Sequence, residues 1–343
     1  MDLPIRIRTT PPAEPVVSVD GAFDAPGLNL SHWPGNRTPA ALRHDLSAGI
    51  ALAFARLDDA EQARLAEGCT AIVNNHYDTD GMAATLAVAR PDEALPRAEA
   101  LLAAAWAGDF FRLPDEDAFR VDAALTALAD PERSPIASAL AGLGDEARWE
   151  RAAHEALERL PRWLDGHLEA ERELWEEPLA RLRADLAALA PAARDDLVHL
   201  DATVWTAPAD AVAFDPGRHA LFGRTTADRV LVLAGDGGGT RARFVLSTKS
   251  FFDLVEETAQ PRPELAALAA RLNELEGGDP GAELAWRHQT RSGASPELWF
   301  GRDGLPSFPE HAGEFLATSR LAPTAVKAAV LDALRDALVL PED

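Results

Sequence analysis

The chain has 343 residues, a formal net charge of −23 and 47% hydrophobic residues. This length and apolar content predict a globular protein with room for two domains. The charge argues against duplex nucleic acid or an anionic membrane as a partner, because phosphates would be repelled. The sequence has no run of about eighteen apolar residues that would span a membrane. It also has no signal-peptide core and only one cysteine, Cys69, which together predict a cytoplasmic protein without disulfides.

The N-terminal part alternates short apolar runs with helical patterns. A β-like run lies at residues 16–19, and strand–helix units follow at 28–57 and 70–89. Successive units of this kind predict an α/β fold, a parallel sheet with crossover helices. Thr38 followed by Pro39 is typical of a helix start, so we expect the first helix to run from there to about residue 57. In such sheets ligands bind beyond the carboxyl ends of the strands.

A polar segment, residues 74–81, joins the second of these strands to its helix. It contains His76, Asp78 and Asp80 at positions i, i+2 and i+4. In an extended segment these three side chains project to the same side. Carboxylate oxygens with one neutral imidazole nitrogen are ligands that suit a hard or borderline divalent cation. The segment therefore predicts a metal site, with these three residues as ligands.

The sequence His76-Tyr77-Asp78-Thr79-Asp80-Gly81 resembles the first motif of DHH-type phosphoesterases. In that motif a strand ends in Asp-x-Asp-Gly, often preceded by His, and a helix of small residues follows. The resemblance implies a Mn²⁺- or Mg²⁺-dependent phosphohydrolase that acts on a small phosphorylated or nucleotide-like substrate through metal-activated water. The Asp-His-His triplet that names the family is absent. The alternative is therefore a non-catalytic relative that serves as a binding or scaffold protein.

Two further residues are candidates for catalytic groups or additional ligands. His32 follows the strand near residue 30, at the edge of the sheet where ligands bind; the alternative is a histidine that bonds only within its loop. Asp109 follows Gly108, the expected end of a helix over 92–107. The negative end of a helix disfavours an Asp there, which points to another partner such as a metal; the alternative is a solvated turn. Asp45, at the border of an apolar stripe, could also reach the site.

Substrate binding is predicted for Arg37 and for the glycine-rich loop that includes Gly237 and Gly238. Arg37 would orient the substrate phosphate. The loop faintly resembles the glycine-rich substrate loop in the C-terminal domain of DHH-type enzymes. Asp-Gly and Gly-Gly pairs are also typical of a simple hairpin connection, and that alternative stays open.

Prolines and glycines between residues 130 and 147 predict a domain boundary. We expect an α/β domain over 1–144 that carries the motif, a helical connector over 145–195 and a smaller mixed α+β domain over 196–343. In the last of these, Ser247 to Ser250 is expected to cap a helix near 251–258. A glycosyltransferase, in which an Asp-x-Asp pair holds the metal of a sugar nucleotide, is a third and weaker alternative. The sequence carries no indication of oligomeric state.

Overall fold

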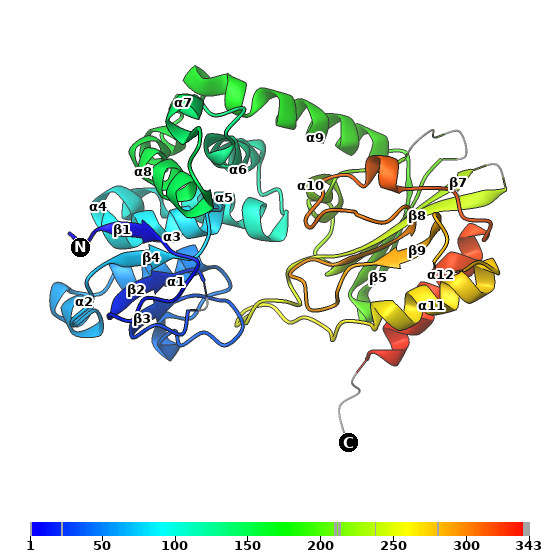
Figure 1. The fold of residues 1–343 in the computed structure, drawn as a ribbon, viewed down its shortest axis with the longest axis horizontal. Helices are drawn as coiled ribbons and strands as arrows, with labels where there is room; N and C mark the ends of the chain where they lie inside the picture. The colour runs from blue at the N-terminus through cyan, green and yellow to red at the C-terminus, as the bar shows by residue number, and fades with distance from the viewer. Residues whose placement is uncertain are drawn as a thin grey trace. The chain divides into compact units, whose positions relative to one another are not determined.

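The computed structural model describes residues 2–338 except residues 22, 209–210, 212–213, 237 and 280. Its contacts divide the chain into two compact units (Figure 1). The first contains Met1–Ala180 together with Phe252–Glu257, and the second contains Arg181–Phe251 together with Thr258–Asp343. Among the described residues, no helix has the length and apolar character needed to cross a membrane.

The first unit is built on a parallel sheet with the strand order β1-β4-β2-β3. Every residue of β2 and β4 is buried, and both strands are mainly apolar, as expected for strands buried on both faces of a parallel sheet. The strands are β1 (Ile5–Ile7), β2 (Val16–Val19), β3 (Gly27–Leu30) and β4 (Ile72–Asn74). The α/β class and the parallel sheet expected for this part of the chain are confirmed.

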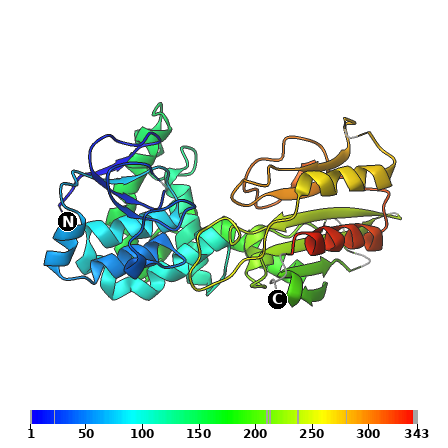
Figure 2. The same ribbon diagram turned by 90° about the horizontal axis from the view of Figure 1, so that it is seen from below.

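Small apolar residues allow the helices of this unit to pack closely. All but one residue of α1 and all but one residue of α3 are buried, and the two helices pack against each other. Figure 2 shows the blue and cyan helices below the dark blue strands of the sheet. The helices are η1 (Ala40–Leu42), α1 (Ser47–Ala55), α2 (Asp59–Leu65), α3 (Thr79–Ala89), α4 (Pro91–Ala94), η2 (Leu95–Arg97), α5 (Ala98–Phe110), α6 (Glu116–Ala129), α7 (Ala137–Leu140), α8 (Asp145–Leu164) and η3 (His167–Leu174).

The long helix expected from Thr38 to residue 57 is wrong in its first half. The Thr38 hydroxyl accepts the N–H of Ser31 and donates to the carbonyl of Ser31, so it closes a loop and cannot cap a helix. Apart from the short turn η1, the chain stays irregular until α1 begins at Ser47. The loop between β3 and α1 thereby becomes available to carry functional side chains.

The second unit is built on a six-stranded mixed sheet with the order β5-β6-β7-β8-β10-β9. Only the β6–β7 pair is parallel. The strands are β5 (Ala193–Leu197), β6 (Ala202–Thr206), β7 (Arg229–Asp236), β8 (Gly239–Leu246), β9 (Ala285–His288) and β10 (Glu297–Gly301), and the helices are η4 (Val198–Leu200), α10 (Arg218–Phe222), α11 (Leu265–Glu276), η5 (Gly313–Phe315) and α12 (Pro323–Asp336). The yellow α11 and red α12 contribute leucines and valines to the core that covers this sheet (Figure 2).

The predicted domain boundaries at 144/145 and 195/196 stay predictions, but the connector predicted for 145–195 is divided between the two units. Its last helix, α9 (Glu176–Leu189), spans the division at residues 180 and 181. The helix expected near 251–258 is wrong, because that stretch has no helical turn. Residues 252–257 instead pack within the first unit.

A buried ion cluster holds the middle of the six-stranded sheet. Glu297 on β10 receives hydrogen bonds from Arg218 and from two nitrogens of Arg243, at 2.6 and 2.9 Å. The side chains of all three residues are almost completely buried. The carboxylate is therefore the counter-charge for two guanidinium groups that water does not reach.

We predict that Glu297→Gln destabilises the protein by about 3–5 kcal/mol, because it removes the buried carboxylate that both guanidinium groups share. The Asp215 carboxylate, 3.3 Å from Arg243, remains in place. Urea unfolding followed by circular dichroism measures the change. Asp332→Asn is the control, since Asp332 pairs with Arg335 on an exposed surface and its loss should cost less than about 1 kcal/mol. Equal effects of the two changes would contradict the prediction.

Candidate metal centre

The ends of three neighbouring parallel strands supply the core of the site. Asp20 directly follows β2, His32 lies two residues after β3, and His76 lies two residues after β4. Because β4, β2 and β3 are adjacent in the sheet, these side chains start about 5 Å apart from strand to strand. Asp20 adopts a left-handed backbone conformation with φ of +64°, which turns the chain sharply at the end of β2.

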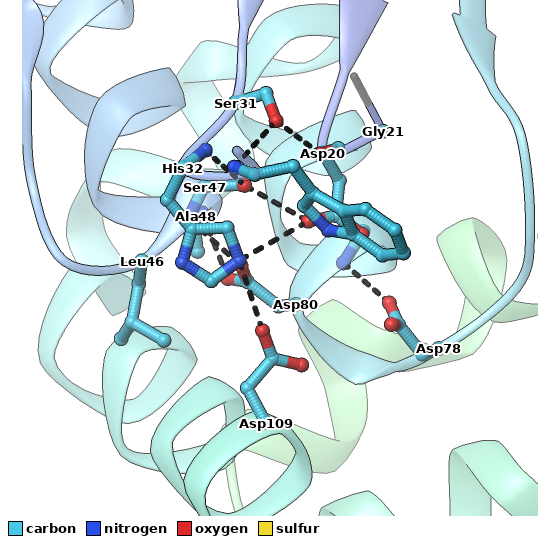
Figure 3. Close-up of polar contacts among 12 residues, drawn as sticks. Asp20, Gly21, Ser31, His32, Leu46, Ser47, Ala48, Asp78, Asp80 and Asp109 are labelled. Carbon is cyan, nitrogen blue, oxygen red and sulfur yellow. Dashed lines mark hydrogen bonds and ion pairs between the residues drawn. The ribbon is translucent and has the colours of Figure 1, made fainter. Parts of the chain in front are cut away.

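The His32 ring points at three carboxylates (Figure 3). Its Nε2 atom lies 3.1 Å from Asp109, 3.6 Å from Asp80 and 3.7 Å from Asp20. All four residues are buried, and one ligand atom from each lies within 4.8 Å of the others. The structure thus brings together His32, Asp109 and Asp80, three of the residues singled out from the sequence.

A hydrogen bond from its other nitrogen fixes the orientation of the His32 ring. Nδ1 lies 2.6 Å from the backbone carbonyl of Asp45, and a carbonyl oxygen can only accept, so Nδ1 carries the proton. In the neutral ring Nε2 is then a lone-pair acceptor, and it has no hydrogen-bond partner among the described residues. An acceptor that faces three carboxylates needs a proton or a cation between them. A backbone carbonyl on the second nitrogen is the usual environment of a metal-binding histidine.

A second group shares Asp20 with the first. His76 Nε2 lies 2.6 Å from Asp78 and 3.1 Å from Asp20, and ligand atoms of these three residues lie within 4.8 Å of one another. The Nδ1 atom of His76 is directed at the side-chain oxygen of Asn75. Both histidines therefore present Nδ1 to an oxygen acceptor and Nε2 to carboxylates.

The three motif residues reach the site by a different geometry from the one expected. The extended segment predicted for 76–80 is wrong: Asp78 accepts the N–H of Gly81 at 2.8 Å and caps α3, so the chain is already helical from Thr79. Asp80 lies in the first turn of that helix. Its two oxygens accept the N–H groups of Ser47 and Ala48 at the start of α1, at 2.7 and 2.8 Å. Because of this cap, Asp80 belongs to the first group, whereas His76 and Asp78 belong to the second.

Gly81 is required by the crowding at the start of α3. A Cβ atom at this position would lie 2.1 Å from the Asn74 side chain and 3.0 Å from carboxylate oxygens of both Asp20 and Asp78. No side chain fits there without displacing candidate ligands. The glycine of the motif therefore allows neighbouring side chains to pack closely against the backbone, in addition to any freedom that it gives the turn.

The electrostatics of the cluster reflect the excess of carboxylates. Burial, and then the neighbouring Asp109 and Asp20 carboxylates, raise the pKa of Asp80 well above its usual value. Burial, and then the charges of Asp78 and Asp20, do the same to the pKa of Asp109. Burial opposes the ionised form of Asp20 too, but the two histidines and the Ser47 hydroxyl outweigh it and lower its pKa to about 2. Asp20 is thus the carboxylate that stays ionised.

The pKa of His76 moves in the direction expected for a ring between two acids. Burial opposes its protonated form, but Asp78 and Asp20 outweigh burial and raise the pKa well above 6.5. Without a cation, the proton on His76 supplies the positive charge between these carboxylates. A bound cation would take the place of that proton.

Asp109 reaches the cluster from the end of α5. This helix continues to Phe110, so Gly108 lies inside the helix and Asp109 occupies its last turn. The expectation that the helix ends at Gly108 is therefore wrong, but the unfavourable position of Asp109 near the negative end of a helix remains. Its Oδ2 atom lies 3.1 Å from His32 Nε2.

The residues predicted to bind substrate do not join the cluster. Arg37 donates to the backbone carbonyls of Phe23 and Ala25, so its side chain is engaged with the loop between β2 and β3. Gly238 lies in the turn between β7 and β8 of the second unit, with φ of +96°. Gly237 lies outside the described residues. The hairpin interpretation of this loop agrees with the β7–β8 pairing.

Asp20 is the member of the site that sequence reasoning missed. The signal was present, because Asp20 directly follows the β-like run at residues 16–19. The rule that ligands gather at the carboxyl ends of parallel strands applies to that strand as much as to the two that were considered.

A parallel sheet with a buried His and carboxylate cluster at its carboxyl edge defines an α/β protein with a candidate centre for divalent cations. The chain belongs to a family of unknown function, DUF6687, which matches residues 7–342. No curated protein matches the chain, and no solved structure does.

We predict that Asp109→Asn stabilises the cation-free protein at neutral pH by about 1 kcal/mol or more, because the buried Asp109 carboxyl must either hold a proton or carry a charge beside other carboxylates, and Asn requires neither. The folded-state pKa of Asp109 is raised, so its ionisation costs stability as the pH rises through that pKa, and the gain from Asn should vanish near pH 4. Thermal unfolding with a chelator at both pH values measures this. A lower melting temperature at neutral pH would contradict it.

Proposed function

We propose that this protein is a phosphoesterase that depends on a divalent cation. The observation that carries the proposal is the geometry of His32, whose buried Nε2 faces the carboxylates of Asp20, Asp80 and Asp109 while Nδ1 donates to a backbone carbonyl. Oxygen donors with an imidazole nitrogen suit Mn²⁺ or Mg²⁺. The choice of phosphoesters rests on the resemblance of residues 76–81 to the first DHH-type motif, now joined by a second group of candidate ligands.

Two sets of residues would hold cations, with Asp20 common to both. The first set is Asp20, His32, Asp80 and Asp109, and the second is Asp20, His76 and Asp78. This assigns His32 and Asp109 as ligands, whereas the sequence left both a catalytic and a ligand role open for them. When bound, a divalent cation lowers the pKa of a water molecule and neutralises charge on phosphate oxygens.

The protein's own residues determine how a substrate would approach. The side chains of His32, Asp20 and Asp80 are completely buried, whereas those of His76 and Asp78 are 23% and 35% exposed. A phosphate would therefore enter from the His76 and Asp78 side. His76, whose pKa is raised by these carboxylates, would hold a proton at Nε2 until a cation displaces it.

The charge of the protein fits a small substrate bound through cations. With a net charge of −23, the surface as a whole repels phosphate, so the attraction must be local. Arg37 does not supply it, since its guanidinium is bonded to backbone carbonyls. A cytoplasmic location remains part of the proposal.

A non-catalytic binding or scaffold protein is the second candidate, and one observation favours it. Asp78 caps α3 and Asp80 accepts two N–H groups at the start of α1. Each carboxylate therefore has a structural role worth about 1 kcal/mol, which would keep it in place without a cation. Cation binding separates the two candidates.

We predict that the wild-type protein binds Mn²⁺ with micromolar or tighter affinity and that Asp20→Asn abolishes binding, because Asp20 belongs to both groups. Calorimetric titration measures the affinity. Hydrolysis of a chromogenic phosphodiester should require Mn²⁺ and be lost in the same variant. A wild-type protein that binds no Mn²⁺ would instead support the scaffold alternative.

A matched pair of variants controls for helix capping. Asp78 caps α3 and Asp115 caps α6, each by accepting one backbone N–H, at 2.8 and 2.7 Å. Asn caps helices about as well as Asp, so Asp78→Asn and Asp115→Asn should fold equally well. Only Asp78→Asn should weaken Mn²⁺ binding, since Asp115 belongs to neither group.

We predict that Mn²⁺ affinity rises with pH. The pKa values of Asp80, Asp109 and His76 are all raised in the cation-free protein, so a cation must displace protons that these groups hold more tightly than usual. Affinity should increase by about tenfold per pH unit for each proton released. Titrations between about pH 5 and about pH 8 in buffers of different ionisation enthalpy give the number of protons. A pH-independent affinity would contradict the prediction.

A further inference from the structure

Residues 252–257, here called the clasp, leave the second unit and pack in the first. They lie in sequence between β8 and α11, which both belong to the second unit, yet their contacts assign them to the first. They form neither helix nor strand. Their position is therefore determined by particular contacts within the first unit. The residues that make these contacts include Asp45, His32, Trp33, Asn36, Phe110 and Arg112.

The carboxylate of Asp45 anchors the clasp through three successive backbone N–H groups. It accepts from Val255 at 2.6 Å, from Glu256 at 2.9 Å and from Glu257 at 3.0 Å. Successive N–H groups turned to one side form a concave site for an anion, and here the anion is a completely buried Asp side chain. These bonds compensate the burial of its charge.

The same Asp45 orients His32 through its backbone, because its carbonyl accepts the Nδ1–H of the ring at 2.6 Å. The clasp contacts the His32 ring from another side. Phe252 stacks on the imidazole with the ring centres 3.8 Å apart and the planes 17° from parallel. The N–H of Asp253 also donates to the His32 carbonyl at 2.8 Å.

A further contact ties the clasp to the helix that carries Asp109. Glu257 forms two hydrogen bonds of 2.5 Å with Arg112, which lies just beyond the end of α5. The Arg112 guanidinium in turn lies over the ring of Trp106 in that helix, 4.4 Å from its centre. The clasp therefore contacts the supports of two candidate ligands, His32 and Asp109.

We propose that Asp45 is a positioning residue of the cation centre and that the clasp it anchors holds His32 with Nε2 toward the carboxylates. The affinity for a cation then depends on the clasp, which lies in sequence between β8 and α11 of the second unit. Since such coupling is reciprocal, a bound cation also stabilises the docked clasp. This inference rests on the proposed cation-dependent function.

The coupling can be measured without any substrate. Mn²⁺ alone is titrated by calorimetry into the full-length wild type, Asp45→Asn and Phe252→Leu, and hydrogen exchange of the amides of residues 255–257 is followed with and without Mn²⁺. We expect each variant to bind Mn²⁺ about 10- to 100-fold more weakly, the usual effect of losing a group that orients a ligand. We also expect Mn²⁺ to slow amide exchange in the clasp of the wild type, and Asp45→Asn to accelerate it.

Two controls separate positioning from general loss of stability. Glu276→Gln changes another buried carboxylate that accepts a backbone N–H, that of Arg320 at 2.8 Å in the second unit, and should leave Mn²⁺ affinity unchanged. Phe252→Tyr keeps the stacked ring and should restore the affinity lost in Phe252→Leu. The absorption spectrum of bound Co²⁺ should change in Asp45→Asn, because it reports the ligand geometry around the ion.

The outcomes distinguish this inference from the proposed function. If the wild type binds Mn²⁺ and both variants bind it equally well, the clasp is structural and the inference is overturned while the proposed function stands. Unchanged amide protection in Asp45→Asn, or wild-type exchange that does not respond to Mn²⁺, also overturns the inference. A wild type that binds no Mn²⁺ overturns both.

Discussion

The hydrogen bond from His32 Nδ1 to the Asp45 carbonyl is the constraint on which the chemistry of this protein depends. It directs the other ring nitrogen, Nε2, into a buried space lined by carboxylates, where like charges repel in a low dielectric. Such an arrangement is stable only if protons or cations share the space. The raised pKa values of Asp80, Asp109 and His76 reflect the same need for protons or cations, since each group tends to hold a proton that a cation would replace.

The fold reduces the cost of this cluster by giving its acids separate partners. Asp80 receives two N–H groups at the start of α1, Asp78 receives one at the start of α3, and Asp20 receives the hydroxyl of Ser47. Helix N-termini stabilise negative charge, so part of each charge is compensated before any ion binds. The remaining lone pairs converge because three adjacent parallel strands end together. The helices that cover the sheet thus also hold the candidate ligands.

The fold and much of the site could be predicted from local patterns. Strand–helix alternation indicated the parallel sheet, and the rule about strand ends indicated His32 beside His76. The geometry within the motif could not be predicted, because alternation along an extended chain and the first turn of a capped helix both place His76, Asp78 and Asp80 near one another. The capping bond of Asp78 decides between them, and it depends on how the loop enters α3.

Other errors came from contacts that are distant in sequence. Thr38 looked like a helix cap because its hydroxyl is a good acceptor, but Ser31 uses that hydroxyl first. Residues 251–258 looked helical after a capping sequence, but Asp45 offers three of their N–H groups a buried carboxylate more than 200 positions earlier in the chain. A helix would have directed those groups along its own axis. No local pattern carries that information.

The clasp also explains why Asp45 accompanies the cluster without joining it. Its carboxylate is turned toward the backbone of residues 255–257, while its carbonyl is turned toward His32. A single residue therefore fixes both the ring and the segment stacked on that ring. If the carboxylate instead faced the cluster, it would add a further buried negative charge beside Asp20, Asp80 and Asp109. Because the Asp45 carboxylate accepts backbone N–H groups instead, the protein orients His32 without adding to the repulsion among the carboxylates of the cluster.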